Sequence, residues 1–521
     1  MSEKENVDFG FRSDSGSIPR DRGCHCRMLK ARVVLYMLSF TGFLVSFMMR
    51  TDMNIAMVAM AKTNRPKDNS SDIPGFCHTY INLTDGTNIS GEDGEFEWSS
   101  SIQSIIISSF YWCYVVSQVV GGILTQVCGT KIVFGVSQLV TAVCSLFIPW
   151  FAELHWAGLI VLRSIQGLAS GLTWPAMYAV VGHWIPIHER SRFMSSFQGF
   201  SFGIGLTYML GGVLISNFGW RVLFYITGSL GVVWCIFWFA LAYDTPEKHP
   251  RITSHELMYI QSHIGNAVVS SKKTIFQGMK VPWKDIFRSM PAWSIGITTF
   301  GRIWVHYTFM IPGPKYMKNV LGLHIQENGA ISGAPFICSY FSSVIFCVIA
   351  DKLHQKELLD LTTIRKINTA ISQVLPGLLL LLIGYLGCQL ILVFILWFIA
   401  VILVTAAYAG AMASIVDIAP NLAGPVLAFA QTIHMSASFI SPLVAGAILE
   451  EGENINNWRI VFGVAVAVAC FTYLPYYIWG TARVQDWNYP GGKQPIDSDP
   501  PSEVLQPLQP EEDKNPKSKK R

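Results

Sequence analysis

Charged residues are scarce in this 521-residue chain, at 14% of the sequence, whereas a soluble domain carries about 25%. Hydrophobic residues make up 51% and gather into long runs, many of which reach the roughly 20 residues that span a bilayer. The composition therefore excludes a soluble globular protein and predicts a polytopic one embedded in the lipid bilayer. The net charge of +4 lies in loops and tails and does not indicate nucleic-acid binding.

Motifs for ATP-driven pumping and metal-dependent catalysis are also absent. The sequence has neither a G-x-x-x-x-G-K-[ST] phosphate-binding loop nor an H-E-x-x-H zinc motif. Its eleven cysteines are scattered, mostly within apolar runs, without the spacing of a zinc site or a disulfide framework. We therefore expect no enzyme, no metal and no cofactor, apart from a coupling ion.

Twelve apolar spans can be drawn, in two sets of six. The polar, basic stretch 243–290 separates the sets, which indicates an all-α membrane protein made of two six-helix bundles. The predicted parts are a tail at 1–32, a first bundle at 33–242, a central loop at 243–290, a second bundle at 291–480 and a tail at 481–521.

The basic residues predict the orientation. The first tail, the "HERSR" loop at 188–192, the central loop and the last tail are all basic, so both termini are expected in the cytoplasm. Loop 61–98 falls on the opposite side. It carries the three N-x-[ST] sequons of the chain, which predict glycosylation at Asn69, Asn82 and Asn88, although a polar loop with incidental asparagines would show the same pattern.

Three arginines fall within predicted spans: Arg50 in the first, Arg163 in the fourth and Arg302 in the seventh. A charge inside the bilayer costs about 2.5–3.5 kcal/mol on insertion scales, so such residues are functional candidates. A guanidinium fork suits a carboxylate or a phosphate. We expect Arg50 and Arg302, with Tyr307, to bind a small anion. In the alternative, each arginine pairs with a carboxylate to hold helices together, and Arg163 could also reach the membrane interface.

Two further residues are candidates for coupling transport to a cation. Asp52 lies two residues after Arg50, a rotation of roughly 200° along a helix, so the two cannot form one compact pair. Asp52 could hold a proton or coordinate sodium, or pair with an arginine on another helix. His306 shares a helix face with Arg302 and could relay protons, or it could simply bond a neighbouring helix.

Several stretches resemble solute carrier family 17, a family of phosphate and organic-anion transporters within the major facilitator superfamily. "RSIQGLASGLTWPAMYAVVGHWIPIHERSR" (163–192) is similar to its R-x-x-x-G…P…W-x-P…E-R-S-[RK] stretch, and "FGRIWVHYTFMIPGPKYM" (300–317) and "DIAPNLAG" (417–424) follow in the expected order. The resemblance implies the major facilitator fold, in which two six-helix bundles rock about a central site.

The resemblance also implies roles for single residues. Arg50 and Arg302 match the arginines of anion recognition, and Arg163 matches one tied to charge coupling. The sequence departs from the family at Gln166 and Ser170, where organic-anion members carry acidic residues. We interpret Arg190 of "HERSR" and Asp351 of "ADKL" as gating elements.

Together these features predict a secondary active transporter in the plasma membrane, a cation-coupled symporter of inorganic phosphate or a small organic anion. The coupling ion would be sodium or a proton. One alternative is a proton-coupled exporter of acidic metabolites from a lysosomal or vesicular compartment. Another is a non-transporting receptor on a transporter scaffold.

Glycosylation of loop 61–98 is the first testable prediction. Because the sequons lie on the non-cytoplasmic side, glycosidase should increase the gel mobility of protein expressed in animal cells. Substitution of Asn69, Asn82 and Asn88 by Gln should abolish that shift and leave transport largely intact. A wild-type band that glycosidase does not move would contradict the predicted topology.

Overall fold

The computed structural model describes residues 30–62, 94–186, 189, 193–263, 282–387, 389–420 and 422–488. Asn69, Asn82, Asn88 and Arg190 lie outside these residues, so their predicted roles stay predictions. The described residues are almost entirely helical, and their β-structure is one isolated bridge between Ala61 and Phe96.

The helices of the first half pack into one bundle. In chain order they are α1 (Ala31–Met60), α2 (Ser100–Cys128), α3 (Thr130–Leu154), α4 (Trp156–Ser170), α5 (Thr173–Trp184), the short η3 (Ser195–Gln198) continued by α7 (Gly199–Phe218), and α8 (Trp220–Leu241). Three short elements connect them to the second half: η4 (Pro246–Lys248), α9 (Ser254–His263) and α12 (Trp283–Arg288).

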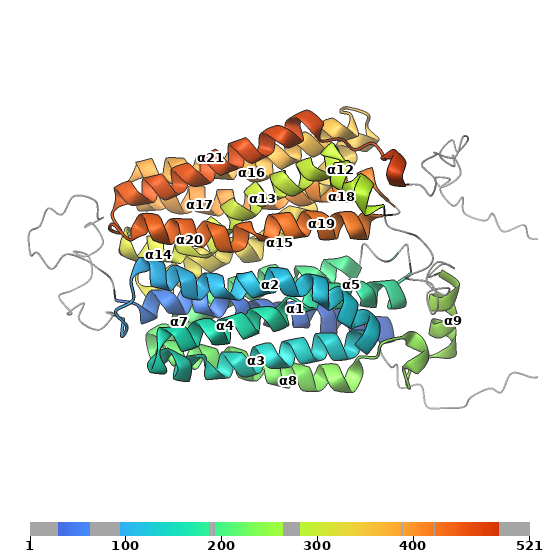
Figure 1. The fold of residues 1–521 in the computed structure, drawn as a ribbon, viewed down its shortest axis with the longest axis horizontal. Coiled ribbons are helices and arrows are strands. Elements are labelled where there is room, and N and C mark those ends of the chain that lie inside the picture. The colour runs from blue at the N-terminus through green and yellow to red at the C-terminus, as the bar shows by residue number, and fades with distance from the viewer. Residues whose placement is uncertain are drawn as a thin grey trace, which may run out of the picture.

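The helices of the second half form the other bundle. They are α13 (Met290–Met310), α14 (Pro312–Asn319), α15 (Ile325–Gln355), α16 (Leu361–Leu386), α17 (Leu390–Val404), η5 (Thr405–Tyr408), α18 (Ala411–Ile418), α19 (Ala423–Met435), α20 (Ala437–Leu449) and α21 (Ile455–Trp479), followed by η6 (Asp486–Asn488). The two bundles lie as two layers, one below the other in Figure 1.

The helix bounds agree with the twelve predicted spans to within a few residues. Nine spans among the described residues are long and apolar enough to cross a membrane by length and composition. The other three predicted spans correspond to α2, to α4 with α5, and to α13. Many apolar side chains point outward, such as Val127, Ile391 and Phe471, each more than 70% exposed, as expected for a surface that faces lipid.

Proline lies next to two of the breaks between helices. α4 ends at Ser170, and α5 begins two residues before Pro175, while Pro312 starts α14 directly after α13. Glycine explains why the first break is so closely packed: a Cβ on Gly167 would lie 1.9 Å from the Phe110 carbonyl oxygen, and one on Gly171 would lie 1.9 Å from Ser117 Oγ. The α4–α5 region therefore sits directly against the α2 backbone.

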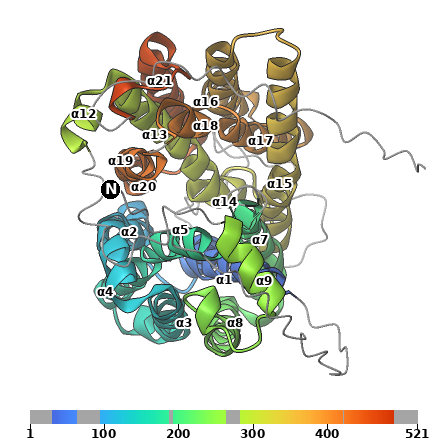
Figure 2. The ribbon, with the colours of Figure 1, turned by 90° about the vertical axis from the view of Figure 1, so that its right-hand side faces the viewer.

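The bundles meet along two seams, α7 with α15 and α2 with α20, which Figure 2 shows end-on. On the first seam the backbones touch, because a Cβ on Gly329 would lie 2.3 Å from the Tyr208 carbonyl oxygen, and one on Gly212 would lie 2.8 Å from that of Ile325. On the second seam a Cβ on Gly446 would lie 2.2 Å from Ser104 Oγ. Small residues thus allow the two layers to approach closely.

The outer end, defined as the end where α1 finishes and α2 begins, is closed by contacts between the bundles. The Ser101 amide donates to Glu450 Oε2 (2.8 Å), and Ser100 Oγ donates to Glu453 Oε1 (2.6 Å). Lys318 Nζ also donates to the Val58 carbonyl oxygen (2.7 Å). The amide of Ser101 holds the pKa of the exposed Glu450 carboxyl below its usual value, so this contact is present at neutral pH and weakens only as pH falls through that lowered pKa.

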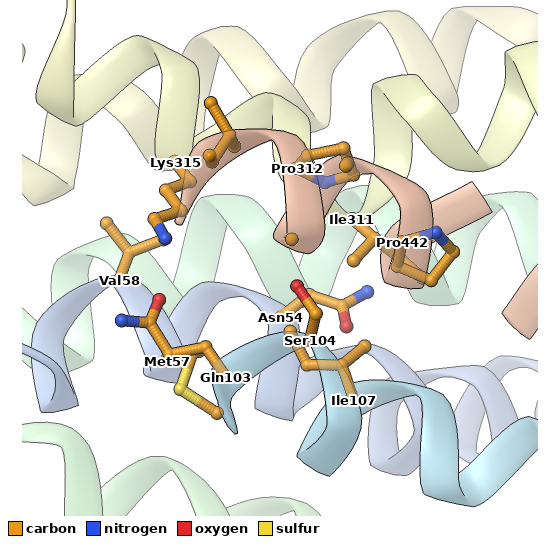
Figure 3. Close-up of a pocket in the computed structure, with 13 residues that line it drawn as sticks. Asn54, Met57, Val58, Gln103, Ser104, Ile107, Ile311, Pro312, Lys315 and Pro442 are labelled. Atoms are coloured by element: carbon orange, nitrogen blue, oxygen red, sulfur yellow. The ribbon is translucent and has the colours of Figure 1, made fainter. Parts of the chain in front are cut away.

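Little space remains beneath these contacts. The pocket in Figure 3 has a volume of about 30 Å³, room for little more than one or two water molecules. Asn54, Gln103 and Ser104 line it from the first bundle, and Pro312 and Lys315 from the second. The outer end is therefore sealed.

The opposite, inner end differs, because its described ion pairs join elements on the same side. Arg32 pairs with Glu189 and with Glu256 (3.1 Å to Oε1) next to the first bundle, and Arg365 pairs with Asp417 (2.7 Å) within the second. Asp351, the predicted gating residue, is exposed near the end of α15. The acid that pairs with Arg365 in the second bundle is Asp417 instead. The contacts of this arrangement thus close the outer end rather than the inner one.

The seal leads to the second prediction. Glu453 accepts hydrogen bonds from Ser100 and Asn319 and pairs with Lys315 at 2.6 Å, so Glu453→Gln should weaken the outer closure. Loss of a charged hydrogen bond of about 1.5–3 kcal/mol corresponds to a roughly tenfold or larger rise in the open population. The measurement uses a Ser104→Cys substitution. It records the rate at which a membrane-impermeant maleimide, added from outside, alkylates that cysteine. Glu451→Gln, at the exposed neighbouring acid, is the control, and equal rates in both variants would refute a latch at Glu453.

Candidate functional site

A cavity of about 320 Å³ lies between the two bundles. From the first bundle, side chains of α1, α5, η3 and α7 line it, including Phe47 and Arg50. From the second bundle, α13, η5, α18 and α19 line it, including Arg302 and Tyr307. Its lining residues contain no Asp or Glu, so the cavity presents cationic side chains without an acidic partner.

Arg50 is held by aromatic rings rather than by a carboxylate. Its side chain is 2% exposed, and Nη2 donates a 2.5 Å hydrogen bond to the Tyr307 hydroxyl across the bundle interface. Its guanidinium carbon lies 4.5 Å from the ring centre of Tyr114, 4.8 Å from that of Tyr111 and 4.9 Å from that of Phe47. Cation–π contacts of this kind stabilise a desolvated cation without neutralising it.

Arg302 lies on the opposite wall of the same cavity. It is half-buried on α13, and its Nε is buried without a hydrogen-bond partner. Tyr307 follows five residues later on the same helix and bonds Arg50. The structure thus brings together the three residues predicted to bind the anion. That binding role itself remains a prediction.

His306 also lines the cavity, one helical turn after Arg302, as expected from their spacing. Its ring centre lies 5.7 Å from those of Tyr307 and Phe336. The imidazole therefore sits among aromatic rings on the wall that carries Arg302, where it could contact a bound solute.

Asp52 and Arg163 lie away from this cavity, inside the first bundle, and neither side chain is exposed. Asp52 Oδ2 accepts a hydrogen bond from Thr227 Oγ1 (2.9 Å), and Oδ1 accepts one from the Met53 amide (2.7 Å). Arg163 Nη1 donates to Gln166 Oε1 (2.8 Å). As expected from the helical rotation, Asp52 points away from the site of Arg50.

The expectation that Arg163 could reach the membrane interface is wrong. The register of α4, which packs against α2 and α3, turns this side chain inward. Its guanidinium carbon lies 4.9 Å from the ring centre of Phe110, and its Nε and Nη2 atoms have no hydrogen-bond partner. Asp52 is the acid whose charge acts on Arg163 through the bundle interior, although the two do not bond directly.

Sequence reasoning missed several residues of the site. Tyr111 and Tyr114, which surround Arg50, lie on α2, and Gln431 and His434 line the cavity from α19. The signal available was weak: aromatic residues three apart on an apolar span, and a histidine within another. Both patterns also fit ordinary helix packing.

Comparisons with known proteins agree with this architecture. Residues 38–372 match the model of the Major Facilitator Superfamily. The chain is 31% identical to human sialin over 458 residues, which cover 88% of this chain and 90% of sialin. It is also 31% identical to human vesicular glutamate transporter 2 over 468 residues, covering 90% of this chain and 77% of that protein.

Solved structures show the same fold at low identity. A bacterial homologue of the human lysosomal transporter Spinster, in an inward-facing and occupied conformation, superposes with a TM-score of 0.62 at 12% identity, over 87% of this chain and 97% of that chain. The fold and the central cavity define a secondary transporter. The chain belongs to the major facilitator superfamily and, within it, to the family of sialin and the vesicular glutamate transporters, solute carrier family 17.

The third prediction tests the site. Arg302→Lys keeps the positive charge but loses the planar fork, so the apparent affinity for the transported anion should fall about tenfold or more. The measurement is concentration-dependent uptake, normalised to protein in the membrane. Arg288→Lys, on the exposed surface of α12, is the matched control. Unchanged affinity in Arg302→Lys would remove this residue from the site.

Proposed function

We propose that this chain is a cation-coupled symporter of a small organic anion. The observation that carries the proposal is the placement of Arg50 and Arg302 on opposite walls of one cavity between the bundles. An anion bound there would contact both bundles at once. Rocking of the bundles would then expose it to one side of the membrane and afterwards to the other.

The cavity favours an organic anion over inorganic phosphate. Besides the arginines, its walls are mostly aromatic and apolar, with Phe47, Trp174 and Phe197 on one side and Tyr408 and Met412 on the other. A small, strongly hydrated oxyanion would contact few of these groups. An organic anion can place its acidic group at the guanidinium groups and its apolar body against the rings.

We infer that cation coupling involves Asp52 and Arg163. These two oppositely charged side chains are buried in the first bundle, and the acid is held by Thr227. A proton or a sodium ion at Asp52 would change the charge that Arg163 experiences. Because neither residue lines the cavity, the cation would act through the bundle rather than through direct contact with the anion.

Flux into proteoliposomes tests the proposal. Purified protein should accumulate at least one of glutamate, sialic acid and urate when a sodium or proton gradient is imposed, with voltage clamped separately. Uptake of phosphate alone would refute the organic substrate. Absence of transport under every gradient would instead favour a receptor. A location in the plasma membrane is part of the proposal, and surface biotinylation checks it.

The fourth prediction separates coupling from binding. If Asp52 takes up the coupling cation, Asp52→Asn should retain exchange of substrate across the membrane but lose gradient-driven accumulation. Counterflow and concentrative uptake are measured on the same preparation, and the result is the ratio of concentrative uptake to counterflow. Asp244→Asn is the control, since this acid caps α3 by accepting from the Lys131 amide at 2.8 Å. A wild-type ratio in Asp52→Asn, or a mere fall in folded yield, would show that Asp52 has no coupling role.

A further inference from the structure

Three nitrogen atoms on the cavity walls are buried without a hydrogen-bond partner: Nε of Arg50, Nε of Arg302 and Nδ1 of His434. Buried polar atoms in folded proteins are nearly always paired, so each exception requires an explanation. The two arginines are explained by the anion that they are proposed to bind. His434 is assigned no part in that proposal, yet it lies on the same cavity.

His434 is 3% exposed and lies on α19, in the same cavity wall as Gln431 and within electrostatic range of Arg302. Its Nδ1 atom is buried without a hydrogen-bond partner. His183 on α5 shows the usual arrangement, since its Nδ1 lies 2.7 Å from the Ala179 carbonyl oxygen. The Nδ1 atom of His434 therefore differs from that of His183, which is paired within its own helix.

The two ring nitrogens differ in which one is available. In a neutral imidazole one nitrogen donates and the other accepts. Nδ1 is buried, whereas Nε2 is not among the buried unpaired atoms, so Nε2 is the nitrogen that His434 can offer to the cavity, as an acceptor. Arg302, on the same wall, supplies only donors. The wall therefore provides donors for an acidic group and one acceptor close to them.

We propose that His434 is a specificity-determining residue that accepts a hydrogen bond from a hydroxyl or amino group of the transported anion. The proposal rests on the proposed function, because it assumes that an organic anion occupies this cavity. It narrows the substrate class to organic anions that carry a hydrogen-bond donor beside the acidic group. An anion without such a donor would leave His434 unpaired and would bind less tightly.

Three benzoates that differ in one substituent test this inference. Benzoate has no second polar group, 3-methoxybenzoate adds an acceptor, and 3-hydroxybenzoate adds a donor. Dissociation constants come from thermal stabilisation of the purified full-length chain in detergent. The wild type should bind 3-hydroxybenzoate about fivefold more tightly than the other two.

Variants of His434 give the decisive comparison. His434→Phe keeps a ring of similar size but removes both nitrogens, so the fivefold preference should disappear. His434→Gln places an amide near the position of Nε2 and should retain much of it. His183→Phe is the matched control because that imidazole lies outside the cavity, and it should keep the full preference.

Each outcome bears on a different claim. The same preference in wild type and His434→Phe, or no preference in wild type, overturns the role of His434 and leaves the proposed function intact. Failure of all three benzoates to bind the wild type overturns the organic-anion site, and the role of His434 with it. A structural role is tested separately: ligand-free His434→Phe should unfold at no lower temperature than wild type, because Nδ1 has no hydrogen-bond partner in the fold and Nε2 is offered to the cavity, and a clear fall would contradict the proposal.

Discussion

The arrangement of the central cavity depends on how the positive charge of Arg50 is stabilised within the membrane. Arg50 is almost fully buried, and a carboxylate would be the strongest partner for it. It is held instead by one phenol and a set of aromatic faces. These groups lower the cost of burial but do not cancel the charge. The positive potential therefore remains available to an incoming anion, which a neutralised arginine could not attract as strongly.

The surroundings of the second buried arginine, Arg163, differ from those of Arg50. Arg163 shares the interior of the first bundle with Asp52, an acid of the same bundle to which it is not directly bonded. Arg50 is bonded to Tyr307 on the other bundle, and that contact must change when the bundles rock. One arginine therefore shares the interior of a single bundle with an acid, while the other is bonded across the interface between the bundles. This division agrees with the proposal that Asp52 and Arg163 serve coupling while Arg50 serves binding.

Much of the fold could be predicted from the sequence, because bilayer thickness fixes the length of every span and proline marks the breaks. Arg50 and Arg302 were found because charge in an apolar run is a strong signal, and Tyr307 lies on the same predicted span as Arg302. Other features depend on which helices meet, and no single span contains that information. The register of α4 buried Arg163, and the packing of α2 against α1 put Tyr111 and Tyr114 around Arg50.

The seams between the bundles show how the sealed outer end can coexist with a mobile interface. Along α7 and α15 the backbones touch at Gly212 and Gly329, so the layers cannot come closer there. Such contacts are short-range and carry no ion pair, which allows rotation about them at little cost. The hydrogen bonds of Glu450 and Glu453 join the bundles at the outer end through polar groups. Opening the cavity outward therefore requires these polar contacts to break, together with the Arg50–Tyr307 hydrogen bond that also joins the bundles.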